Sequence, residues 1–96
     1  MEPSERIYNG DRAREVLENE AFIAAFADMQ TEIIEQWKQS PARDGEGREK
    51  LWQLLSLSNK LQSLLQTSLE TGKLAKLDLQ HDQKLKDRAK ALVGWN

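Results

Sequence analysis

A glycine-containing loop between two amphipathic segments is the feature that most constrains the fold of this chain. The loop, residues 41–47 (PARDGEG), holds two glycines and an aspartate, which give the backbone the freedom that a chain reversal requires. Ser40 precedes Pro41, and a residue before proline is disfavoured in the helical region, so a helix should end there. We therefore predict that two helices meet at this loop as an antiparallel hairpin.

The two flanking segments have the periodicity of helices. Apolar residues recur at steps of three and four from Glu20 to about Gln39, and again from about Arg48 to Thr71. Gly72 stands where the C-terminal cap of the second helix is expected. The apolar residues that we predict to join the two helices are Ile23, Ile34, Trp37, Leu51, Leu55 and Leu65.

The second helix carries more apolar surface than one neighbouring helix could cover. Trp52, Leu57 and Leu64 remain after the hairpin closes, and contiguous exposed apolar area usually marks an interface. A chain of 96 residues is also small for a self-sufficient core. We predict that these three residues contact a second copy or a partner, most simply in a dimer whose two hairpins form a helical bundle.

The ends of the chain differ from its middle. Residues 1–10 show no periodicity and are predicted to be a flexible arm. Asp11 can cap a short helix through Glu18, and Asn19 should interrupt the helix or cap a new one. The predicted organisation is an all-α fold with a hairpin core over residues 11–72 and a basic, peripheral C-terminal helix or tail over residues 73–96.

Charge is distributed unevenly along the chain. Residues 1–47 carry eleven acids and five bases, whereas residues 73–96 carry six bases and three acids. A basic tail could contact an acidic partner or nucleic acid. Asp78, Asp82 and Asp87 dilute this charge, so nucleic-acid binding is the weaker prediction. The residues proposed for such a contact are Lys84, Lys86, Arg88, Lys90 and Trp95.

The residue pattern does not predict catalysis. The chain has no cysteine, and its one histidine, His81, lies between Gln80 and Asp82 on a polar segment. No glutamate precedes this histidine by three residues, as carboxylate metal sites of helical bundles require. The glycine loop lacks the Gly-Lys-Ser/Thr ending of a phosphate loop. We predict a protein that is not an enzyme, holds no cofactor or metal, and does not enter a membrane.

The central segment, from Trp37 to Ala75, resembles a group of small proteins encoded by tailed bacteriophages and prophages. The similar features are the Trp37–Lys38 pair, the charged loop from Arg43 to Glu49, and the ending Glu-Thr-Gly-Lys-Leu-Ala over residues 70–75. The opening from Arg12 to Leu17 matches more loosely. The resemblance covers about two-thirds of the chain and brings no catalytic residue with it.

This resemblance implies a function in protein–protein interaction. The group is encoded near packaging and head genes, which suggests a role in virion assembly or as a virion component, in the host bacterial cytoplasm or in the particle. Two alternatives stay open. The acidic first helix could inhibit a host defence or metabolic protein by binding a basic site on it, or the tail could bind nucleic acid as a packaging accessory.

Overall fold

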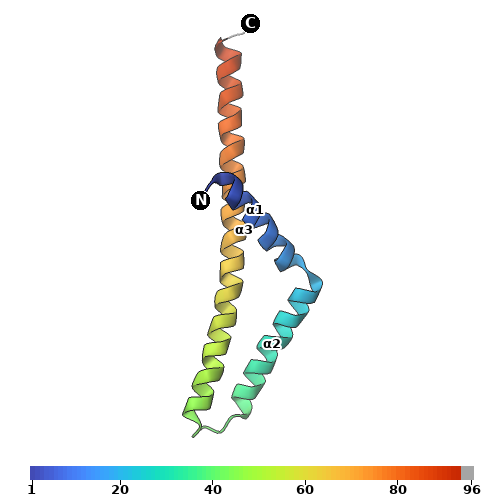
Figure 1. The fold of residues 1–96 in the computed structure, drawn as a ribbon, viewed down its shortest axis with the longest axis vertical. Coiled ribbons are helices and arrows are strands. Elements are labelled where there is room, and N and C mark those ends of the chain that lie inside the picture. The colour runs from blue at the N-terminus through green and yellow to red at the C-terminus, as the bar shows by residue number, and fades with distance from the viewer. Residues whose placement is uncertain (94–96) are drawn as a thin grey trace.

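Three α-helices account for almost all of the structure. The computed structural model describes residues 1–93, with α1 over Pro3–Glu18, α2 over Glu20–Gln39 and α3 over Gly45–Val93 (Figure 1). No strand occurs in this described part of the chain. The all-α prediction is therefore confirmed.

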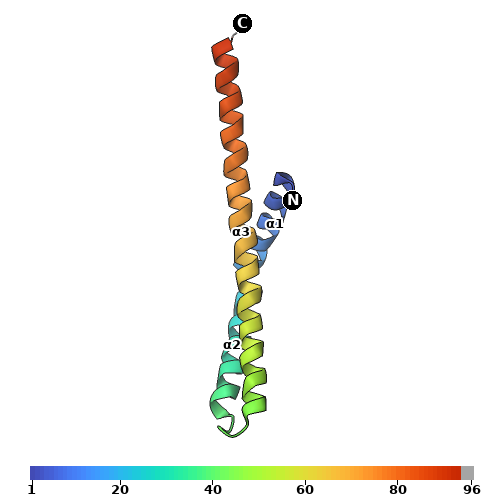
Figure 2. The ribbon, with the colours of Figure 1, turned by 90° about the vertical axis from the view of Figure 1, so that its left-hand side faces the viewer.

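The molecule is a rod because one helix is very long. α3 has 49 residues, and a rise of about 1.5 Å per residue gives a helix of roughly 74 Å. The longest dimension of the molecule is 79 Å. From the turn at the lower end of Figure 1, α2 separates from α3, and α1 then returns to cross α3 near its middle. The C-terminal end of α3 extends beyond both shorter helices (Figure 2).

Short polar side chains set the ends of the helices. The Asn19 Oδ1 atom accepts a hydrogen bond from the Phe22 N–H at 2.9 Å, which caps α2 as predicted. Ser40 is extended, and α2 ends before Pro41. At the start of α3, the Asp44 Oδ1 atom accepts from the Gly47 N–H at 3.1 Å. The two glycines of the predicted turn therefore lie inside the first turn of α3.

Arg48 holds the turn between α2 and α3 closed. Its guanidinium carbon lies 4.0 Å from the centroid of the Trp37 ring, a cation–π geometry. Its Nη1 atom also donates to the Ser40 Oγ atom at 3.0 Å and to the Ser40 carbonyl at 3.2 Å. All of these contacts come from one planar guanidinium group, whose donors have fixed directions. They therefore fix the direction in which the chain leaves α2.

α1 crosses α3 in close contact at two glycines. A Cβ added to Gly72 would lie 2.9 Å from the Gly10 Cα, and one added to Gly10 would lie 2.8 Å from the Gly72 Cα. Ala13 and Ala75, three residues further along each helix, are buried as well. An ion pair between the Asp11 Oδ1 and Lys76 Nζ atoms, 2.8 Å apart, borders the crossing.

This crossing corrects two predictions. The flexible arm predicted for residues 1–10 is wrong, because α1 begins at Pro3 and runs through this segment. Pro3 suits the first helical position, where its missing N–H costs nothing, and Gly10 is a packing residue. The predicted cap at Gly72 is also wrong, because α3 continues through it. Gly72 is helical, and its small size admits α1.

The predicted division of the chain at residue 72 does not match the structure. Residues 73–93 are helical, as expected, but they continue α3 without a break. The prediction that Asp11 caps a helix is wrong too, since Asp11 lies inside α1. Its carboxylate instead pairs with Lys76 across the crossing.

The predicted contact between α2 and α3 exists, but it does not enclose a core. Of the six residues proposed for this contact, Ile23, Ile34 and Trp37 are exposed, while Leu51, Leu55 and Leu65 are half-buried. The Gln30 Nε2 atom donates across the pair to the Asn59 Oδ1 atom at 2.9 Å and to the Ser58 Oγ atom at 3.1 Å. The residues buried in the described chain are Gly10, Ala13, Phe26, Ser58, Gly72 and Ala75.

Candidate interaction surfaces

An apolar groove lies between α2 and the first half of α3. It has a volume of about 400 Å³, and its walls are Met29, Ile33, Leu54, Leu57, Ser58, Lys60, Leu61 and Leu64. Leu57 is 67% exposed and Leu64 is 53% exposed. Two of the three predicted interaction residues therefore share one open surface, which we call the leucine groove.

The leucines of this groove form a row along α3. Leu54, Leu57, Leu61 and Leu64 are separated by steps of three, four and three residues, which places them on one face of a helix. Leu54 and Leu61 are seven residues apart, as are Leu57 and Leu64. This is the spacing of the apolar seam of a coiled coil. Met29 and Ile33 of α2 complete the groove, and sequence periodicity alone did not identify their part in it.

Trp52 lies on a different surface. It lines a second hollow of about 220 Å³ together with Ile33, Ile34, Trp37, Leu51 and Leu55. Five residues separate Trp52 from Leu57, which is about 140° around an α-helix. The structure therefore does not bring Trp52 together with Leu57 and Leu64, and the predicted interaction set divides into two surfaces.

α1 closes the leucine groove at its upper end. Ser68 and Ala75 continue the row of Leu54 and Leu61 at seven-residue steps. The crossing at Gly72 lies between them, and a Cβ on Gly10 would come within 3.0 Å of the Ser68 carbonyl oxygen. Small residues thus replace leucine where α1 packs. The open part of the row is limited to residues 54–64.

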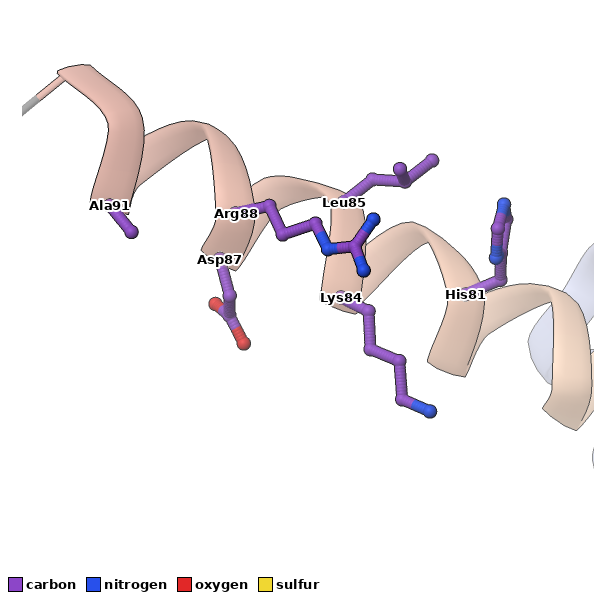
Figure 3. Close-up of a pocket in the computed structure, with 6 residues that line it drawn as sticks. All are labelled: His81, Lys84, Leu85, Asp87, Arg88 and Ala91. Carbon is purple, nitrogen blue, oxygen red and sulfur yellow. The ribbon is translucent and has the colours of Figure 1, made fainter.

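The predicted basic residues lie on the part of α3 that projects beyond α1. Figure 3 shows Lys84 and Arg88 with His81 and Leu85 along this single helix. Lys86 and Lys90 are also exposed, but each of them lies two residues along the helix from Lys84 or Arg88. They therefore face roughly 160° away from that pair. The basic charge is split between two sides of the helix, and Trp95 lies outside the described residues.

A third surface on α3 is polar and carries little charge. It is lined by Asn59, Gln62, Ser63, Gln66, Thr67 and Glu70. These amides and hydroxyls lie on a different side of the helix from the leucine row. Because they can satisfy their hydrogen bonds with water, this face does not need a partner to cover it.

Two further features of the described residues concern metal binding and shifted pKa values. No group of three or more histidine, cysteine, aspartate or glutamate side chains lies close enough to hold a metal ion in this part of the chain. One carboxyl has a shifted pKa. The hydrogen bond from Lys76, with the positive charge of that residue, lowers the pKa of Asp11 below the ordinary value of 3.8. This ion pair joins α1 to α3, so its role is structural.

The comparisons with known proteins leave the residues and their geometry as the basis for a function. No protein-family model matches the chain, and neither a curated protein nor a solved structure matches it. Among residues 1–93, no helix has the length and apolar character that a membrane crossing requires.

Proposed function

We propose that this chain is a non-enzymatic interaction protein that works by associating with itself and with another protein. The observation that carries the proposal is the amount of exposed surface. The chain exposes 7568 Å², whereas a compact monomer of 11.0 kDa exposes roughly 5,600 Å². The difference of about 2,000 Å² is in the range that one subunit of an obligate dimer buries.

The apolar character of the exposed surface supports the same proposal. Leucines and tryptophans along α2 and the first half of α3 are exposed, including Trp37, Trp52 and Leu61. No large side chain in the described part of the chain is completely enclosed. Apolar side chains gain free energy when they leave water. A partner that covers them would supply the core that the single chain lacks.

The resemblance of residues 37–75 to small phage proteins suggests where this interaction operates. We propose a role in the assembly of the phage head or in DNA packaging, with the protein present in the host bacterial cytoplasm or in the particle. An elongated protein of this kind would suit a connecting or organising role between other subunits. The split arrangement of basic residues on α3 does not favour a nucleic-acid groove, which needs charge on one face.

The oligomeric state is the first test of this proposal. We expect sedimentation equilibrium at micromolar concentration to give at least twice the mass of one chain. The melting temperature should rise with protein concentration, because dilution dissociates an oligomer whose subunits stabilise one another. A stable monomer over the same range would contradict self-association.

The partner is the second test. Affinity capture of the tagged chain during particle assembly should recover a packaging or head protein. Recovery of a host defence or metabolic protein would instead support the inhibitor alternative, in which the exposed acids Asp28, Glu32 and Glu35 of α2 face a basic site.

A further inference from the structure

We infer that the leucine groove is the site at which a second copy of this chain docks, with a two-fold axis between Leu57 and Leu61. This inference rests on the proposed self-association and assigns it to one surface. It places Leu54, Leu57, Leu61 and Leu64 of each copy in the interface, with Met29 and Ile33 at its edge. Trp52 lies outside it.

The spacing of the leucines points to a copy of the same row. In a two-fold interface, the same patch is used by both subunits and must be complementary to itself. Leucines at steps of three and four residues fulfil this condition, because side chains from one helix fit between those of an identical helix. The row is centred between Leu57 and Leu61, so these two leucines would lie beside the axis and close to the same leucines of the other copy.

The charge of the groove also favours a second copy over a charged foreign segment. Of the described residues that line the groove, Lys60 alone is charged. A groove that selected an acidic or basic partner would carry opposite charge along its rim. The net charge of the whole chain is only −2, so two copies do not repel each other strongly.

α1 sets the limits of this interface. Because α1 crosses α3 at Gly72, a docking copy can occupy the row only below Ser68. The open row from Leu54 to Leu64 is about 15 Å long at the helical rise. The projecting end of α3 is therefore outside the interface. In the dimer it stays free to contact a different protein.

A cysteine placed at Leu61 tests the position of the axis. The chain has no cysteine of its own, so Leu61→Cys introduces one thiol. Docked copies would hold two such thiols close together, and a short bismaleimide should join them at least about tenfold faster than a collision-limited control. Ser63→Cys is that control, because Ser63 is exposed and lies two residues away on a different side of the same helix.

A pair of charge-matched variants tests the leucine groove by dissociation. Leu57→Lys with Leu64→Lys places two charges in the groove and should give a monomer by sedimentation. Gln62→Lys with Gln66→Lys adds the same charge to the polar face of α3 and should leave the oligomer intact. Trp52→Lys should also leave it intact, since Trp52 lines the other hollow.

The outcomes separate this inference from the proposed function. A monomeric wild type would overturn both. If the wild type is an oligomer but the Ser63→Cys variant cross-links as fast as the Leu61→Cys variant, the groove assignment alone is overturned. Dissociation by Trp52→Lys, but not by the two leucine changes, would do the same and would move the interface to the hollow between Trp37 and Trp52. If the leucine variant unfolds, the cross-linking result decides.

Discussion

At the scale of single residues, Gly72 shows how packing can oppose helix propensity. Alanine normally stabilises a helix interior by about 1 kcal/mol relative to glycine. At Gly72 the added Cβ would lie 2.9 Å from the Gly10 Cα and 3.0 Å from the Arg6 carbonyl oxygen. Both are backbone atoms, so α1 would have to move, and such overpacking typically costs about 1–3 kcal/mol.

We therefore expect Gly72→Ala to lower the free energy of unfolding in urea, although propensity alone predicts a rise. Gly45→Ala is the matched control, because no atom lies within 4 Å of the Cβ that it would add. This control should be neutral or slightly stabilising. Equal stability of the two variants would show that α1 and α3 do not cross at the glycines.

Asp11 gives the molecule a pH dependence of known sign. Its pKa is lowered in the folded chain, first by the hydrogen bond from Lys76 and then by nearby positive charges. Because its pKa is lowered by folding, the charged Asp11 carboxylate stabilises the folded chain at pH values above the pKa that it has in the unfolded chain, near 3.8. This stabilisation is lost as the pH falls through the lower pKa that Asp11 has in the folded chain. The ion pair is partly exposed, so salt should weaken it.

We expect Asp11→Asn to be less stable than wild type at pH 6, with the difference disappearing as the pH falls below 3.8. Thermal unfolding across this range measures the difference. Asp28→Asn, which changes an exposed carboxylate on α2, serves as the control. A difference between Asp11→Asn and wild type that persists unchanged at low pH would show that the ion pair does not carry the effect.

At the scale of elements, two parts of α3 have different support. Residues 45–76 contact α2 and, through Gly72 and Lys76, α1. Residues 77–93 extend beyond both helices, and their leucines are exposed, with Leu77 and Leu92 among them (Figure 2). A helical segment of this length without tertiary contacts is marginally stable in water.

Hydrogen exchange should therefore divide α3 near residue 77. Backbone amides of residues 77–93 should exchange faster than those of residues 65–76, because opening the projecting segment breaks few tertiary contacts. Mass spectrometry of the exchanged chain can resolve the two segments. Equal protection along α3 in the purified protein would mean that a partner or a second copy covers the projecting end.

At the scale of the whole molecule, elongation is the property that solution scattering can test. The Cα radius of gyration is 22.0 Å, whereas a compact chain of this length has about 12 Å. Even a dimer built through the leucine groove should stay well above the roughly 16 Å of a compact dimer, because both α3 ends project. A value near that of a compact particle would show that α3 bends back on itself.

The residues by themselves determined much of the secondary structure. Periodic apolar residues predicted α2 and the first half of α3, Ser40–Pro41 predicted the end of α2, and Asn19 predicted the break before it. These signals act over one or two helical turns, so a local reading finds them. The excess of apolar surface at Leu57 and Leu64 was also visible in the sequence.

Only the tertiary structure decided what Gly10, Gly72 and Asp11 do. Local rules assign glycine to turns and caps and aspartate to helix starts, but here all three lie inside helices. Their partners are Gly72, Gly10 and Lys76, more than sixty residues away in the chain, and no local pattern encodes a contact at that separation. The same limit applies to the leucine groove. The row of leucines on α3 could be found from their spacing. The position of α2 beside α3 was needed to show that Met29 and Ile33 line the groove and that Trp52 does not.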